Sequence, residues 1–211
     1  MSPTPKRRSA RALVSAMRPT QWVKNGLIAV APAAAHSLTH ADVLGRTATA
    51  FVAFCFMASG IYLVNDVRDA ASDRLHPTKR SRAIASGDLS TRAALTSAVV
   101  CVLIGFAIPL ALSSPQGLLL ILAIYLVVSL GYSFGLKNVA VIELGVVASG
   151  FFLRAYAGAV TSHIPVSTWF LVVISFGAPM APSSKAHEVR QAVAQLGLGG
   201  GHGVGHQHRD G

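Results

Sequence analysis

The sequence predicts an all-α, integral membrane helical bundle, on the basis of its composition, its long apolar stretches and the distribution of its charges. Of the 211 residues, 52% are hydrophobic and 12% are charged, whereas about 25% of the residues of a typical soluble domain are charged. Several apolar stretches reach the roughly 20 residues that a membrane-spanning helix needs. We therefore expect most of the chain to lie in a lipid bilayer.

Six apolar stretches are candidates for the membrane helices. The first, residues 22–35, is short and contains Pro32, which is compatible with a broken, tilted or re-entrant element covered by other helices. The stretches that follow are residues 43–64, 93–112, 117–136, 139–160 and, shortest among these five, 167–180. We expect five or six membrane helices.

Basic residues alternate between the connections. Residues 6–24 contain six Lys or Arg and residues 68–92 contain another six, whereas residues 36–42, 113–116 and 161–165 contain none. Cytoplasmic loops collect Lys and Arg. We therefore expect a multi-pass protein of the inner (plasma) membrane, with its N-terminus and the loop after residue 65 in the cytoplasm.

The net charge of +10 is better explained by lipid than by nucleic acid. The basic residues flank membrane segments, whereas a nucleic-acid binder collects them on a soluble face. Each Lys or Arg beside a membrane contributes about 1 kcal/mol of attraction to an anionic leaflet. We expect the lipid bilayer as a partner and no nucleic acid, and a homo-oligomer stays an open alternative to a monomer.

Acidic residues are concentrated after residues 43–64. Asp66, Asp69 and Asp73 are three of only eight in the chain, and steps of three and four place them on one helix face about 10 Å long. Such carboxylates suit Mg²⁺, which typically takes one or two of them plus substrate phosphates. The alternative is a solvated helix end paired with nearby arginines.

Further motifs accompany the aspartates. They are RPTQWVKN at 18–25, NDVRDAASD at 65–73, HPTKRSR at 76–82 with Gly87, YS at 132–133, LK at 136–137, Glu143, and FLRA at 152–155. In this order they resemble the UbiA-type prenyltransferase superfamily, and within it the decaprenyl-phosphate phosphoribosyltransferase branch. The resemblance extends from residue 18 to about residue 178.

The resemblance implies a bundle of about nine membrane helices, of which this chain would hold five or six. It implies Mg²⁺-dependent transfer of phosphoribose from phosphoribosyl pyrophosphate to a polyprenyl (decaprenyl) phosphate, for cell-wall arabinan precursors. Asp66 and Asp69 would hold Mg²⁺ against the diphosphate, and Asp73 a second ion or the ribose hydroxyls. These three are the catalytic and metal-binding candidates.

Polar and basic residues around the aspartates are the substrate-binding candidates. They are Lys24, Asn25, Asn65, Lys79, Arg80, Arg82, Lys137 and Arg154. Asn65 is better explained as a helix-end amide that satisfies the backbone than as a catalytic residue. A charge as deep as Arg154 usually faces the bundle interior with a partner, so an ion pair with Glu143, or snorkelling, is as well supported as substrate contact.

The end of the chain differs from the rest. We expect a basic segment at 1–21, a partial UbiA-like membrane domain at 22–180, and a disordered Gly- and His-rich tail at 181–211. The loss of resemblance near residue 178 suggests a truncation or a change of reading frame. Two alternative functions therefore stay open: prenyl transfer from a polyprenyl diphosphate to an aromatic acceptor, and a catalytically inactive membrane fragment.

Overall fold

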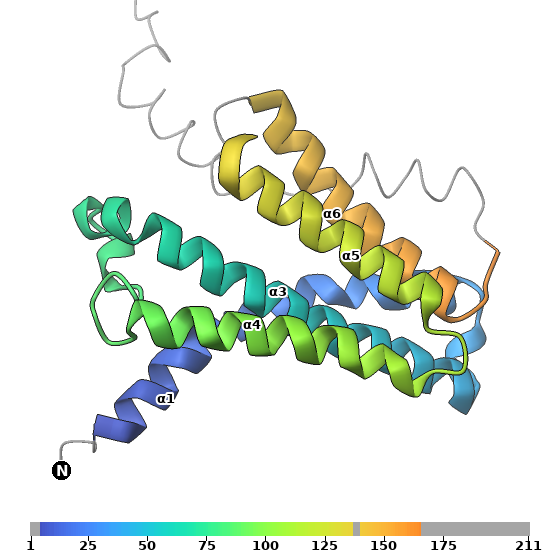
Figure 1. Ribbon diagram of the computed structural model, residues 1–211. Coiled ribbons are helices and arrows are strands. Elements are labelled where there is room, and N and C mark those ends of the chain that lie inside the picture. The colour runs from blue at the N-terminus through green and yellow to red at the C-terminus, as the bar shows by residue number, and fades with distance from the viewer. Residues whose placement is uncertain (1–4, 137–139, 166–211) are drawn as a thin grey trace, which may run out of the picture.

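The computed structural model describes residues 5–136 and 140–165, with the side chains of 9–134 and 145–165. Within these residues the chain forms helices and loops and contains no strand. Figure 1 shows the long helices lying side by side as a bundle. The predicted all-α membrane bundle is confirmed.

Eleven helical elements follow one another in the described residues. They are α1 (Pro5–Ala16), η1 (Pro19–Ala29), α2 (Val30–Ala34), η2 (Ser37–Thr39), α3 (Ala41–Leu75), η3 (Lys79–Ser81), α4 (Thr91–Ala107), η4 (Ile108–Ala111), α5 (Gln116–Gly131), η5 (Tyr132–Leu136) and α6 (Ala140–Thr161). Elements η1 to η4 are 3₁₀-helices, whereas η5 is a π-helix.

Three helical stretches of the described residues are long and apolar enough to cross a membrane: Ala41–Leu75, Thr91–Ala111 and Gln116–Phe134. The first contains all of the predicted segment 43–64. The second contains 93–112 except its last residue, and the third contains 117–136 except its last two residues. The predicted segment at 139–160 coincides with α6, whose described part Gly145–Thr161 is a shorter apolar helix. The segment at 167–180 lies outside the described residues, so the total of five or six membrane helices stays a prediction.

The predicted first segment, residues 22–35, is broken as expected. It begins in the 3₁₀-helix η1 and continues into the five-residue helix α2, which contains Pro32. This element packs closely against α6, where a Cβ atom on Gly158 would overlap the carbonyl oxygen of Ile28. Ile28 and Pro32 of this element are buried, whereas Gly26 is exposed, so the element is covered by protein on one side.

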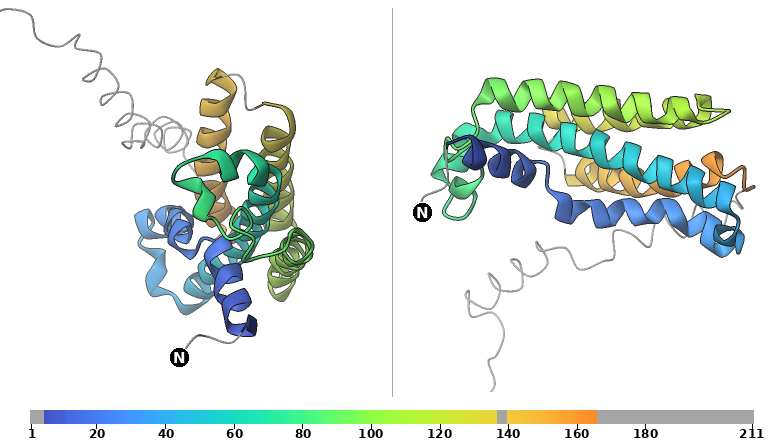
Figure 2. Two further views of the ribbon diagram at one scale, coloured as in Figure 1. Left: turned by 90° about the vertical axis from the view of Figure 1, so that its left-hand side faces the viewer. Right: turned by 90° about the horizontal axis from the view of Figure 1, so that it is seen from below.

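Helix α3 organises the core. Figure 2 shows it between α4 on one side and η1 with α2 on the other, and it also contacts α5 and α6. Phe54 and Met57 of α3 are completely buried, in one apolar cluster with Leu118 and Leu122 of α5. A second cluster, around Leu63, holds α1 and the loop after α3 against the end of α3.

Both clusters determine which parts of the chain meet at one end of the bundle. The end of α1, the last turns of α3, η3 and the end of α5 all lie at this end (Figures 1 and 2). The basic N-terminal segment and the aspartates therefore share one end, as the charge distribution predicts.

Candidate functional site

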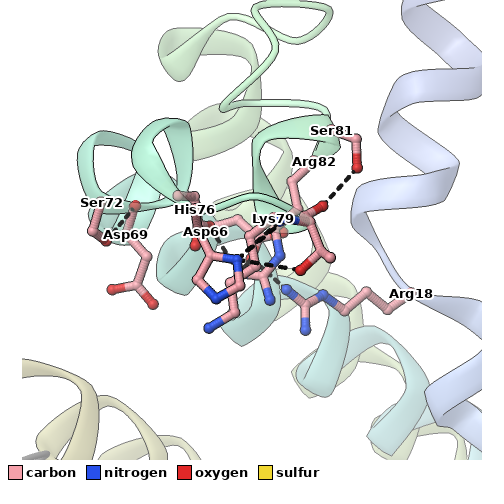
Figure 3. A network of polar contacts seen from close by, with 10 residues as sticks. Arg18, Asp66, Asp69, Ser72, His76, Lys79, Ser81 and Arg82 are labelled. Atoms are coloured by element: carbon pink, nitrogen blue, oxygen red, sulfur yellow. Dashed lines mark hydrogen bonds and ion pairs between the residues drawn. The ribbon is translucent and has the colours of Figure 1, made fainter.

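The three aspartates occupy the last turns of α3, but their environments differ. Asp66 and Asp73 are each only 4% exposed, whereas Asp69 is half-buried. Figure 3 shows the Asp69 carboxylate pointing away from Arg18 and Arg82. The helical spacing does place all three on one side of α3, yet they do not converge.

Two arginines neutralise the buried pair of aspartates. Arg18 Nη2 lies 2.5 Å from Asp66 Oδ1. Arg82 Nη1 lies 2.8 Å from Asp73 Oδ2 and 3.5 Å from Asp66 Oδ1. Asp66 and Asp73 therefore pair with arginines, as in the alternative interpretation, but both carboxylates are buried and not solvated.

Arg18 is a site residue that the sequence did not single out. It has a left-handed backbone, with φ of 53°, and its guanidinium lies 5.1 Å from the centre of the Tyr62 ring. A non-glycine residue in this conformation is uncommon and often marks a functional position. The available signal was its place in the RPTQWVKN motif; its pairing with a residue 48 positions later leaves no trace in the sequence.

The resemblance implies that Asp66 and Asp69 hold one Mg²⁺ ion and that Asp73 holds a second ion or the ribose hydroxyls, and these roles stay predictions. Among the described side chains, no group of three or more His, Cys, Asp or Glu is placed to hold a metal ion. Seven residues of helix separate Asp66 from Asp73 by about 10 Å, and Arg82 occupies the Asp73 carboxylate. Asp66, although it also pairs with Arg18 and Arg82, would with Asp69 supply two carboxylates to a Mg²⁺ ion that keeps waters and phosphate oxygens as its other ligands.

A cavity of about 220 Å³ lies beside the aspartates, between η1, α3, α5 and α6. Its polar lining includes Lys24, Asn65, Tyr125, Ser129, Tyr132 and Arg154. Two of these side chains are cations, and none is an Asp or Glu. The electrostatics of the cavity therefore favour an anion.

Arg154 is the most buried charge of the cavity, at 7% exposure. Its Nε donates to Asn25 Oδ1 at 2.7 Å, Nη1 to the Gly150 carbonyl at 2.7 Å, and Nη2 to the Tyr125 hydroxyl at 2.8 Å. The side chain of Glu143 lies outside the described residues. Among the described side chains, no carboxylate pairs with Arg154, so neutral groups hold a charged guanidinium at the cavity wall.

Asn25 supports Arg154 and does not line the cavity. It is completely buried, and its Nδ2 donates to Cys55 Sγ at 3.3 Å while its Oδ1 accepts from Arg154. The expectation of direct substrate contact by Asn25 is therefore corrected. The two Asn25 contacts use both ends of its amide.

Lys24 adds a second positive charge to the cavity. It lies in η1, outside the three candidate membrane spans. Crowded cations of this kind are relieved by a bound anion.

Asn65 lines the cavity next to the aspartates. Ser133 Oγ, from η5, donates to Asn65 Oδ1 at 2.5 Å. Asn65 therefore links α3 to η5 at the end of α5, and its side chain is not used to satisfy its own helix end.

The remaining candidates lie at the rim or beyond the described part of the chain. Lys79 and Arg80 are exposed in η3. His76 Nδ1 accepts from the Thr78 and Lys79 amides at 3.3 and 3.4 Å, so His76 caps the turn that ends α3 (Figure 3). Lys137 lies outside the described residues.

Comparison with known proteins gives consistent results. The chain is 40% identical over 197 residues to the decaprenyl-phosphate phosphoribosyltransferase of Mycolicibacterium smegmatis, covering 92% of this chain and 61% of that protein. It is 42% identical to the Corynebacterium glutamicum protein of the same name, covering 87% of this chain and 56% of the relative. It is 44% identical to the Mycobacterium tuberculosis protein of that name, covering 83% of this chain and 59% of the relative.

The chain thus spans about three fifths of the length of these relatives. The model of the UbiA prenyltransferase family matches residues 26–194. These residues are most of the chain, and they include the aspartates and nearly all of the cavity lining. The chain belongs to the UbiA prenyltransferase family.

Proposed function

We propose that this site transfers phosphoribose from phosphoribosyl pyrophosphate to a polyprenyl phosphate, with Mg²⁺ as cofactor. The observation that carries the proposal is the combination, at one end of the bundle, of carboxylates with a cavity whose described lining contains two cations and no Asp or Glu. A reaction between two phosphorylated substrates needs both. The names of the three relatives support this choice of substrates.

The donor diphosphate binds at the aspartates. Asp66 and Asp69 would hold Mg²⁺, which when bound neutralises the charge that develops on the leaving pyrophosphate. Arg18 and Arg82 already lie at Asp66. A guanidinium group can bind two oxygens of a phosphate in the same bidentate way in which it binds the two oxygens of a carboxylate. Lys79 and Arg80 extend this basic surface at the rim.

The acceptor phosphate binds in the cavity, against Arg154 and Lys24. A phosphate monoester is already ionised near neutral pH, so its oxygen attacks the anomeric carbon without a general base. The carbon–oxygen bond to pyrophosphate breaks as the new one forms. The cavity residues therefore orient the nucleophile and leave its proton state unchanged.

The membrane position fits a lipid acceptor. Three apolar helices of spanning length keep the polyprenyl chain in the bilayer, while the aspartate end faces the cytoplasm, where the soluble donor is made. In this proposal the membrane is the plasma membrane, and the product serves cell-wall arabinan synthesis.

A transfer assay tests the proposal. The full chain, purified in detergent, is incubated with Mg²⁺, ribose-labelled phosphoribosyl pyrophosphate and decaprenyl phosphate. We expect label in the lipid fraction for wild type and no transfer after chelation or in Asp66→Asn and Asp69→Asn. Asp42→Asn is the matched control, because Asp42 lies at the opposite end of α3 and contacts only Arg46 among the described ion pairs.

Three outcomes would contradict the proposal in different ways. Donor binding without transfer would indicate an inactive membrane fragment. Prenyl transfer from a polyprenyl diphosphate to an aromatic acceptor would indicate the other UbiA-type reaction. Transfer that persists in Asp69→Asn would remove that carboxylate from the site.

A further inference from the structure

We propose that Ser133 is a positioning residue, which turns the Asn65 amide so that its NH₂ group binds a phosphate oxygen in the cavity. The inference rests on the proposed function, because it assumes that a phosphorylated substrate enters this cavity. It assigns a role to the Ser133 hydroxyl, which belongs neither to the aspartates nor to the basic residues of the site.

The position of Ser133 is unusual. It lies in the π-helix η5, directly after α5, and it is 1% exposed. Single π-helical turns are often found at functional sites. Here Ser133 meets Asn65 of α3, 68 residues earlier in the chain.

The two contacts of Ser133 favour one direction of the amide. Ser133 Oγ donates to Asn65 Oδ1 at 2.5 Å. It also lies 2.9 Å from the Ser129 carbonyl, but that carbonyl already accepts from the Tyr132 amide. A hydroxyl has one proton to donate, so giving this proton to Asn65 leaves no carbonyl unsatisfied.

With Oδ1 bound to Ser133, the two N–H groups of Asn65 remain for the cavity that Asn65 lines. An amide NH₂ is a donor only. It joins Lys24 and Arg154, which are also donors without acceptor capacity, in the lining of the same cavity. A phosphate, whose oxygens mainly accept at neutral pH, is the ligand that such a set recognises.

The opposite orientation would have a different consequence. If Nδ2 faced Ser133, Oδ1 would point into the cavity as a ligand for Mg²⁺ or a ribose hydroxyl. Asn65→Asp separates the two cases, because it keeps the oxygen acceptors and removes the donors. We expect it to weaken phosphate binding at least tenfold by charge repulsion, whereas an Mg²⁺ ligand would tolerate this change.

The test is a binding experiment on the full chain in detergent, by calorimetry with a short-chain polyprenyl monophosphate, the class of ligand that the proposed function places in this cavity. Ser133→Ala should weaken binding about three- to tenfold, the usual contribution of one hydrogen bond. Combined with Asn65→Ala it should add nothing further, since Ser133 acts through Asn65. Thr49→Ala is the matched control: it removes the hydroxyl of a half-buried α3 residue that donates to the Gly45 carbonyl of its own helix.

Binding of Mg²⁺ alone separates a specific loss from a general structural defect, because a general defect would weaken Mg²⁺ binding as well. We expect Ser133→Ala to leave it unchanged, together with the unfolding temperature. The inference is overturned if Ser133→Ala binds the monophosphate like wild type, if its effect adds to that of Asn65→Ala, or if Asn65→Asp binds the monophosphate normally. Failure of wild type to bind the monophosphate would overturn the proposed function as well.

Discussion

The Nε atom of Arg154 lies 2.7 Å from Oδ1 of Asn25, which joins α6 to η1 across 129 residues of sequence. Asn25 thereby holds a guanidinium at the cavity wall without neutralising it. A carboxylate at position 25 would give a similar geometry but cancel the charge. The choice of an amide preserves the cationic character of the cavity.

Asn25→Asp should therefore abolish anion binding while preserving the fold. The new carboxylate would form a buried ion pair with Arg154, and we expect the affinity for a short-chain polyprenyl monophosphate to fall at least tenfold. The unfolding temperature should stay within a few degrees of wild type, because the pair remains hydrogen-bonded. Equilibrium binding and thermal unfolding in detergent measure the two effects, and unchanged affinity would rule out Arg154 as the phosphate anchor.

Asp73→Asn should reduce stability more than Mg²⁺ dependence. Asp73 is buried against Arg82, and breaking a buried charge pair costs about 3–5 kcal/mol, less here because Arg82 is partly exposed and keeps a contact with Asp66. Asp69→Asn should instead raise the Mg²⁺ concentration needed for donor binding. Titration of Mg²⁺ in both variants distinguishes them. Equal shifts in the Mg²⁺ requirement would show that Asp73 is also a ligand.

Gly158→Ala should disrupt the crossing of η1 and α6. The added methyl group would overlap the Ile28 carbonyl, and overpacking against rigid backbone costs about 1–3 kcal/mol or more. Gly145→Ala is the control on the same helix, because a Cβ atom added to Gly145 would meet no atom within 4 Å and alanine favours helix by up to about 1 kcal/mol. Thermal unfolding should show a loss for the first variant and none for the second.

Single cysteines should report the orientation. Thr39 and Ser86 are exposed in connections at opposite ends of the bundle, and the native Cys55 and Cys101 are buried. In intact cells, a membrane-impermeant maleimide should label Thr39→Cys but reach Ser86→Cys only after permeabilisation. The reverse pattern would invert the proposed topology.

Hydropathy predicted the spanning segments well, because a helix in lipid must be both long and apolar. Residues 43–64 fall inside α3, and Pro32 correctly indicated a broken first element. The three- and four-residue spacing also placed Asp66, Asp69 and Asp73 on one side of α3. These features depend on local sequence alone.

The partners of the charges were not predictable in this way. Arg18 pairs with Asp66, and Arg154 bonds to Asn25 and Tyr125. Each pairing joins segments that only the packing of the bundle brings together. The same holds for Ser133, whose contact with Asn65 depends on the π-helical turn that follows α5.

The length of α3 has a consequence for where the chemistry takes place. Its 35 residues span about 52 Å at 1.5 Å per residue, well beyond the roughly 30 Å of a bilayer's hydrocarbon core. If residues 43–64 fill the hydrocarbon core, as the sequence predicts, the surplus turns would carry Asp66 to Asp73 into the headgroup layer. Two substrates that share no common solvent, one dissolved in water and one in lipid, would then meet at the only depth that both can reach.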